Sequence, residues 1–110
     1  MEGRALADEV VTSLDKSDGI ATVSLRGEVD VLSVDQVRAV LTDALATGSR
    51  EIVVDLSELA FIDSTGLGAL IFGFQRARDA GIRFRLAHPT RMVRQILVLS
   101  GLLEVVELTP

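Results

Sequence analysis

One carboxylate and two hydroxyl groups are adjacent in the segment Phe61-Ile-Asp-Ser-Thr-Gly-Leu-Gly68, at Asp63, Ser64 and Thr65. A serine or threonine hydroxyl can accept a phosphate group, which adds about -1.5 to -2 charges at neutral pH. A phosphate beside the carboxylate of Asp63 would concentrate negative charge on one small surface. The three residues are therefore candidates for the centre of a phosphorylation switch.

The same three residue types are also favoured at the first position of a helix. Their side-chain oxygens accept hydrogen bonds from the backbone N-H groups that a helix leaves free at its start. Capping alone is the more frequent role of such a tripeptide. The two roles are compatible, because the start of a helix is the positive end of the helix dipole and holds a phosphate well.

A predicted strand before the tripeptide and a predicted helix after it put the candidate switch at a strand-to-helix junction. The strand is predicted over 51–56, a short β-branched run. The helix is predicted over 66–80 and ends at Gly81, which can adopt the left-handed conformation of a helix end. Its apolar residues recur at helical spacing and form one face for burial, at Leu67, Leu70, Ile71, Phe74 and Ala77.

A second stripe of the same predicted helix points away from that face. It contains Thr65, Ala69, Phe72 and Arg76. An exposed phenylalanine in line with the hydroxyl turn would suit contact with a partner protein, whereas a loop or the third helix could instead cover the ring. Phe72 is a candidate partner contact whose exposure the sequence leaves open.

The rest of the chain alternates between short strands and helices. A hairpin is predicted over 10–14 and 20–25, because Asp18-Gly19 is a strong turn signal. Ser33 and Gln36 have the spacing of a capping box at the start of a helix. The further predicted elements are a helix over 33–46, a strand over 82–87, a helix over 91–99 with Thr90 as its cap, and a strand over 103–108.

The element order β-β-α-β-α-β-α-β predicts an α/β fold with a mixed sheet flanked by helices. Strands that alternate with single helices are joined by right-handed crossovers and lie parallel, while the leading hairpin adds one antiparallel strand. Loops at the carboxyl ends of parallel strands lie at one edge of the sheet. We therefore expect Glu28 and Asp30 to lie near Asp63, Ser64 and Thr65.

Composition argues against several functional classes. The 110 residues suit one domain, and the absence of cysteine excludes disulfides, thiolate metal sites and cysteine nucleophiles in this chain. The net charge of -5 argues against direct nucleic-acid binding, and no apolar run is long enough for a membrane span. With a single histidine, only Glu28, Asp30 and Asp63 could hold a hard cation, and weakly, so no metal or other cofactor is expected. A soluble, intracellular protein is expected.

A serine hydrolase is a rival interpretation of the strand-to-helix turn. Ser64 would be the nucleophile, with Asp63 and His88 as the other members of a triad. However, Ile62 stands where a nucleophile elbow needs glycine, and His88 lies before Pro89 at a predicted strand end. The sequence therefore predicts a protein that is not an enzyme.

Four short segments together resemble the STAS domain family, and within it the bacterial anti-sigma factor antagonists. They are Leu25-Arg-Gly-Glu-Val-Asp30, Val54-Asp-Leu-Ser57, Phe61-Ile-Asp-Ser-Thr-Gly-Leu-Gly68 and Ser100-Gly-Leu102. Each is a weak signal alone, but four in the same order and at compatible spacing form a strong one. The resemblance covers about residues 10–108, and we expect a single STAS domain over 10–110 after a disordered N-terminal tail over 1–9.

This resemblance implies a cytoplasmic partner-switching protein, expected to be a monomer. The unphosphorylated form would bind an anti-sigma factor that is also a serine kinase, so that a sigma factor is freed. Phosphorylation at Ser64 would abolish binding, and a phosphatase would restore it; Thr65 is the less favoured acceptor. With the geometry expected above, the candidate partner-binding residues are Glu28, Asp30, Asp63, Ser64, Thr65, Gly66 and Phe72.

A STAS interaction module of another kind is the alternative. Such a module could serve as a stressosome-like scaffold or as an accessory subunit of a lipid transporter, without regulation by phosphorylation. The two hydroxyls after Asp63 favour the phosphorylation switch. The sequence does not name the kinase, the sigma factor or the stimulus, because specificity depends on how the side chains of this chain fit the surface of each partner.

Overall fold

The computed structural model describes residues 10–110, and the tail predicted over 1–9 lies outside the described residues. The predicted order β-β-α-β-α-β-α-β is confirmed, with one short 3-10 helix added before the last strand. The elements are β1 (Val11–Ser17), β2 (Ile20–Val29), α2 (Val34–Leu45), β3 (Glu51–Ile62), α3 (Ser64–Asp79), β4 (Arg83–Ala87), α4 (Arg91–Ser100), the 3-10 helix η1 (Leu102–Glu104) and β5 (Glu107–Thr109).

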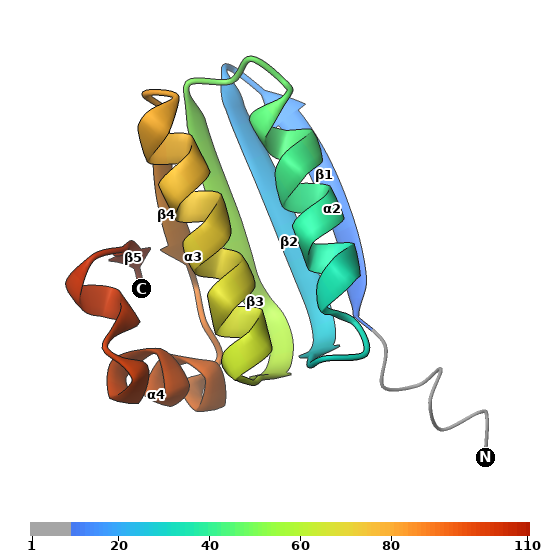
Figure 1. Ribbon diagram of the computed structural model, residues 1–110, viewed down its shortest axis with the longest axis vertical. Coiled ribbons are helices and arrows are strands. Elements are labelled where there is room, and N and C mark those ends of the chain that lie inside the picture. Colours follow the sequence, from blue (N-terminus) through green and yellow to red (C-terminus); the bar gives the residue numbers. More distant parts are fainter. Residues whose placement is uncertain (1–9) are drawn as a thin grey trace.

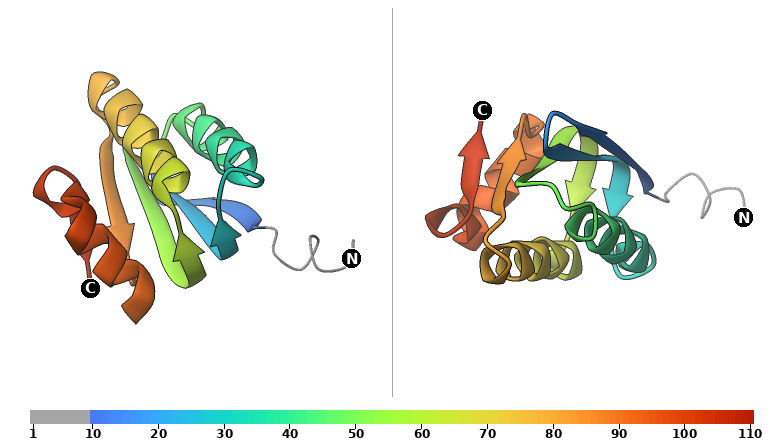
Figure 2. Two further views of the ribbon diagram at one scale, coloured as in Figure 1. Left: turned by 60° about the horizontal axis from the view of Figure 1, so that its bottom comes forward. Right: turned by 90° about the horizontal axis from the view of Figure 1, so that it is seen from above.

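The five strands form one mixed sheet in the order β1-β2-β3-β4-β5. Only β1 is antiparallel to its neighbour, and the other neighbouring strands are parallel. Helices α2 and α3 lie side by side on one face of the sheet, and α4 lies near the end of the sheet where β3 gives way to α3 (Figures 1 and 2). The core lies between the sheet and these helices and includes Val23, Leu25, Leu41, Ile52, Val54, Leu56, Leu70 and Leu86.

The leading hairpin forms as predicted, with β1 and β2 both longer than the predicted strands. Ser17 pairs with Ile20 across the turn, and Asp18 and Gly19 both have positive φ, 56° and 78°. Two central residues of positive φ define the turn type that best matches the twist of a hairpin.

Strand β3 continues to Ile62, well beyond the predicted end at residue 56. Its second half stays paired with β2, up to the pair Val29 and Ile62, but the register shifts twice along the way. These shifts disturb the alternation of apolar and polar residues over 57–61, and that alternation is the signal by which a strand is predicted. The junction with α3 is nevertheless where the sequence indicated.

The buried face of α3 differs from the predicted one. Ile71 is 37% exposed, whereas Ala69, expected on the outward stripe, is fully buried. Helix α2 contacts α3 on the side of Ala69 and Gly73, and a side chain on Gly73 would come within 3.1 Å of Leu41 in α2. Because these two residues are small, the helices approach closely on that side, and Ile71 lies outside their contact.

The C-terminal segment differs in part from the prediction. Thr90 caps α4 by accepting a hydrogen bond from the Val93 N-H, and Gly101 ends the helix with a φ of 81°, both as expected. The predicted strand over 103–108 is replaced by η1 and the three-residue strand β5. Strand β5 pairs in parallel with β4, and an ion pair between Arg83 and Glu107 links the two strands at the surface.

Candidate functional site

Asp63 is the N-cap of α3. One of its carboxylate oxygens, Oδ1, accepts the backbone N-H groups of Thr65 at 2.9 Å and Gly66 at 3.1 Å. The Thr65 hydroxyl donates to the same oxygen at 2.6 Å. This hydroxyl is the largest influence that lowers the pKa of Asp63 below its ordinary value, and the two backbone N-H groups add to it. Asp63 therefore stays ionised at neutral pH.

The two neighbouring hydroxyls have different environments. Thr65 is half-buried and its hydroxyl is bound to Asp63. Ser64 is exposed, and its hydroxyl forms no hydrogen bond within residues 10–110. Of the two, Ser64 is thus the hydroxyl that an incoming phosphate donor can reach without breaking the cap of α3.

Gly66 permits the close turn from β3 into α3. A Cβ atom on this residue would lie 2.5 Å from Cγ1 of Ile62 and 2.8 Å from Cγ1 of Val29, both side chains of the core. Gly68, in contrast, has no atom within 4 Å of the position where its Cβ would be. The tight turn into α3 thus requires glycine at Gly66 and not at Gly68.

The loop after β2 is held by Asp30 and Ser33. The Asp30 carboxylate accepts the N-H of Leu32 at 3.0 Å, and the Ser33 hydroxyl accepts the N-H of Asp30 at 3.1 Å. The predicted capping box is wrong, because Ser33 makes no side-chain cap to α2. Its hydroxyl, in a residue only 1% exposed, is also within 3.1 Å of the Glu28 carbonyl oxygen, to which it can donate.

The expected meeting of the two loops is confirmed for their backbones. The N-H of Asp63 donates to the carbonyl oxygen of Val29 at 3.1 Å, and Glu28 pairs with Phe61 in the parallel register of β2 and β3. Asp30, which follows Val29, is therefore next to the turn of Asp63. The carboxyl ends of β2 and β3 therefore bring the backbones of Asp30, Asp63 and Ser64 close together, as the β-α-β order predicts.

Phe72 is half-buried and not fully exposed. The guanidinium groups of Arg38 in α2 and Arg76 in α3 lie over its ring, 5.8 Å and 5.4 Å from the ring centroid. Cation–π contacts of this kind hold the aromatic side chain in one orientation. Phe72 remains partly accessible on the seam between α2 and α3, and its candidate role stays a prediction.

The structure shows two apolar features near the turn. Val31 and Leu32, in the loop after Asp30, are 68% and 86% exposed. The apolar character of this loop is evident in the sequence, because two consecutive aliphatic residues directly follow the candidate site residue Asp30. The second feature is a groove of about 340 Å³, lined by Ser64, Leu67, Gly68, Ile71, Ser100, Gly101, Leu102 and Val105. Its two walls come from distant parts of the chain.

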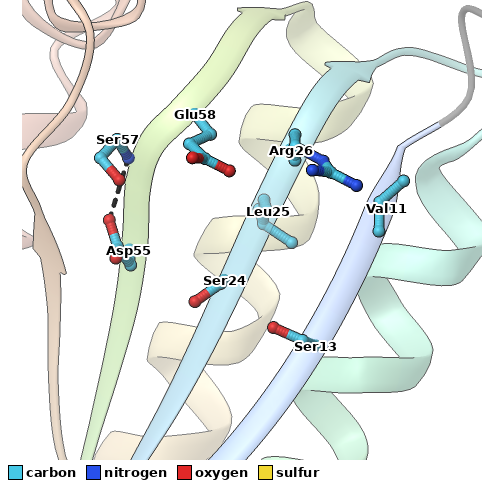
Figure 3. A pocket seen from close by; sticks show the side chains of 8 residues that line it. All are labelled: Val11, Ser13, Ser24, Leu25, Arg26, Asp55, Ser57 and Glu58. Carbon is cyan, nitrogen blue, oxygen red and sulfur yellow. Dashed lines mark hydrogen bonds between the residues drawn. The ribbon is translucent and has the colours of Figure 1, made fainter.

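A second depression lies on the face of the sheet opposite α2 and α3 (Figure 3). Polar and charged side chains surround it, and the Asp55 carboxylate accepts the backbone N-H of Ser57 at its rim. The lining residues are Val11, Ser13, Ser24, Leu25, Arg26, Asp55, Ser57 and Glu58. None of the candidate partner-binding residues lines this depression.

The register of the sheet separates the residues of the hypothetical hydrolase triad. Ala87 pairs with Asp55, so His88 lies alongside residue 56, eight residues before Ser64 on the course of β3. At about 3.3 Å per residue, this separation exceeds roughly 20 Å. The His88 Nδ1 atom instead lies 3.0 Å from the carbonyl oxygen of Pro110.

Two other kinds of feature are absent from residues 10–110. Histidine, cysteine and acidic side chains form no group of three that could hold a metal ion in this part of the chain. Likewise, none of its helices has the length and apolar character that crossing a membrane requires.

Comparison with known proteins points to one family. The model of the STAS domain matches residues 12–110. The Bordetella bronchiseptica protein BtrV, assigned as an anti-sigma factor antagonist, is 29% identical over 93 residues, which are 84% of this chain and 80% of BtrV. The anti-sigma-B factor antagonist of Staphylococcus aureus is 39% identical over 54 residues, 49% of this chain and 50% of that protein. The crystal structure of an anti-sigma factor antagonist from Mycobacterium paratuberculosis has a TM-score of 0.85 at 25% identity, covering 94% of this chain and 87% of that one.

Proposed function

Because the chain belongs to the STAS domain family, and its relatives include anti-sigma factor antagonists, we propose that it acts as an anti-sigma factor antagonist controlled by phosphorylation of Ser64. In this proposal the unphosphorylated protein binds an anti-sigma factor that is also a serine kinase, and a sigma factor is released. The protein itself is a cytoplasmic binding module and not an enzyme.

The observation that carries the proposal is the contrast between Ser64 and Thr65. The Thr65 hydroxyl is bound to the carboxylate that caps α3, so its modification would remove a capping contact. Ser64 is exposed at the first position of α3. A phosphate there would lie at the positive end of the helix dipole, which favours it without any change of fold.

Phosphorylation would end the complex by adding negative charge to the partner surface. Asp63 has a lowered pKa and is already ionised beside the acceptor. A further -1.5 to -2 charges, approximately, would face a partner surface that had matched the unmodified site. A loss of about 1.4 kcal/mol already weakens binding tenfold, and a charge added within an interface commonly costs more. Removal of the phosphate by a phosphatase would restore binding.

The proposal also assigns the partner surface around the turn. Glu28, Asp30 and Asp63 would supply its acidic part, and Phe72 would supply an aromatic contact at the seam of α2 and α3. If Phe72 contacts the kinase, Phe72→Ala should weaken binding at least several-fold while the protein remains folded. Unchanged affinity in that variant would remove Phe72 from the proposed surface.

The proposal is tested by mapping the phosphate. The protein is incubated with ATP and a lysate of its source, and intact mass and peptide mapping are compared for wild type, Ser64→Ala and Thr65→Val. One phosphate on Ser64, absent from Ser64→Ala and retained in Thr65→Val, is the expected result. The responsible kinase is then purified, and it should bind the unphosphorylated protein and not the phosphorylated one.

Two other outcomes would change the proposal. A phosphate on Thr65 would keep the mechanism and correct the acceptor. No phosphate, under conditions in which a known antagonist is modified, would contradict the switch and favour a STAS scaffold or a transport accessory.

A further inference from the structure

Gly68 has no structural role that requires the absence of a side chain. Glycine is, after proline, the residue least favourable to a helix interior. Two other glycines of the same helix lie against close neighbours. A Cβ atom on Gly66 would lie 2.5 Å from Ile62, and a Cβ atom on Gly73 would lie 3.1 Å from Leu41, so a larger residue would be crowded at both positions. At Gly68 the corresponding space is open, and no other part of the described chain fills it. The fold alone would tolerate alanine or a larger residue.

The open space at Gly68 belongs to the groove that also contains Ser64. Leu67 and Ile71 of α3 form one wall, and Leu102 and Val105, after α4, form the other. Ile71 and Val105 are 37% and 63% exposed, so apolar surface on both walls remains in contact with water. Apolar side chains held open on both sides of a shallow groove are typical of a surface that a partner covers.

From these observations we propose that the groove between α3 and the segment 100–105 receives an apolar side chain of the anti-sigma factor kinase, and that Gly68 keeps the groove open for it. This inference rests on the proposed function, since it specifies where the same partner docks. The groove volume of about 340 Å³ leaves room for an inserted apolar side chain. Because Ser64 lines the same groove, a phosphate on Ser64 would affect docking there.

The proposal gives phosphorylation a second effect on binding. A phosphate on Ser64 would put a strongly hydrated charge at an apolar groove. The partner's side chain could then enter only if that charge lost part of its hydration, which is costly. This effect adds to any charge repulsion between the phosphorylated site and the partner. Unlike charge repulsion, it does not require a negative surface on the partner.

The test uses a substitution that fills the groove from within. Gly68→Leu adds an apolar side chain in the open space, and Gln75→Leu adds the same side chain to an exposed position two turns further along α3, outside the groove. The dissociation constant of each variant is measured by calorimetry with the kinase that phosphorylates Ser64. Gly68→Leu should weaken binding at least tenfold, and Gln75→Leu should change it less than twofold. Val105→Ser, which removes apolar surface from the opposite wall, should weaken binding about three- to tenfold.

Each outcome bears on the inference. Thermal unfolding should show Gly68→Leu to be at least as stable as wild type, so that lost binding cannot come from misfolding. Equal affinity of Gly68→Leu and wild type for a kinase that does phosphorylate Ser64 would overturn the groove proposal and leave the proposed function intact. If no kinase binds or phosphorylates the wild type, the proposed function fails and this inference fails with it. If Gly68→Leu instead changes the oligomeric state of the protein alone, the occupant is a second copy of this chain, and the proposal is wrong.

Discussion

The backbone N-H of Asp63 donates a hydrogen bond of 3.1 Å to the carbonyl oxygen of Val29. This bond continues the pairing of β2 with β3 by one residue beyond the last ladder pair, Val29 and Ile62. It therefore holds the loop of Asp30 against the turn that presents Ser64.

The cap of α3 should contribute both to stability and to its pH dependence. Asp63→Ala should lower the free energy of unfolding by about 1–2 kcal/mol at pH 7, because two backbone N-H groups lose their acceptor. Asp63→Asn should lower the free energy of unfolding much less, since asparagine caps helices nearly as well as aspartate. Urea denaturation of the three proteins measures both differences.

The sign of the pH effect follows from the lowered pKa of Asp63 in the folded protein. The charged carboxylate stabilises the fold above the unfolded-state pKa of about 3.9, and this contribution is lost as the pH falls through the lower folded pKa. The stability advantage of wild type over Asp63→Asn should therefore shrink as the pH falls below about 4. A constant difference over this range would contradict the role of the charge.

The two glycines at the start of α3 should respond oppositely to alanine. Gly66→Ala should destabilise the protein by about 1–3 kcal/mol, because its methyl group would overlap Ile62 and Val29 in the core. Gly68→Ala should stabilise it by up to about 1 kcal/mol, since its methyl group meets no atom within 4 Å and alanine is the better helix former. Thermal unfolding of the pair is the measurement, and equal effects would show that the glycines do not differ as described.

The loop of Asp30 should depend on the buried hydroxyl of Ser33. Ser33→Ala should lower the free energy of unfolding by about 1–3 kcal/mol, because the Asp30 N-H loses its acceptor. Ser13→Ala, at an exposed position on the opposite face of the sheet, should change it by less than about 0.5 kcal/mol. Amide hydrogen exchange should also show faster exchange at Asp30 in Ser33→Ala alone.

The last two strands should depend on Glu51. Its carboxylate accepts a hydrogen bond of 2.6 Å from Arg85, lies 3.6 Å from Arg83, and is largely buried. Glu51→Ala should lower the free energy of unfolding by about 2–3 kcal/mol. This value lies between the losses typical of exposed and of fully buried ion pairs. Glu107→Ala, at the exposed end of the same group, should lower the free energy of unfolding in urea denaturation much less than Glu51→Ala does, because solvent screens this ion pair. Similar losses in both variants would be evidence against the central role of Glu51.

The region around α3 illustrates how far sequence patterns reach. Its start and end were predicted from Asp63 and Gly81, whose types favour a cap and a left-handed end without reference to the rest of the fold. The buried face was predicted less well, because helical spacing alone favoured Ile71. The position of α2 decides that Ala69 and Gly73 are covered and that Ile71 is left at the surface.

Ser33 shows the same limit at another helix start. Its spacing to Gln36 fits a capping box, but the loop that precedes α2 turns the hydroxyl back toward Asp30 and Glu28. A capping pattern describes what a side chain can bind nearby. Which of the available partners it binds depends on the path of the chain before the helix.

Local patterns in the sequence predicted the α/β order, the hairpin, the family and the turn of Asp63, Ser64 and Thr65, because caps, turns and periodicity depend on neighbours within a few positions. The packing of the elements set the remaining features. It distinguished Ser64 from Thr65 through the bond from Thr65 to Asp63, and it brought the segment 100–105 beside α3 to form the groove. These features join residues through the register of the sheet and the contact between helices, and such contacts leave no local pattern in the sequence.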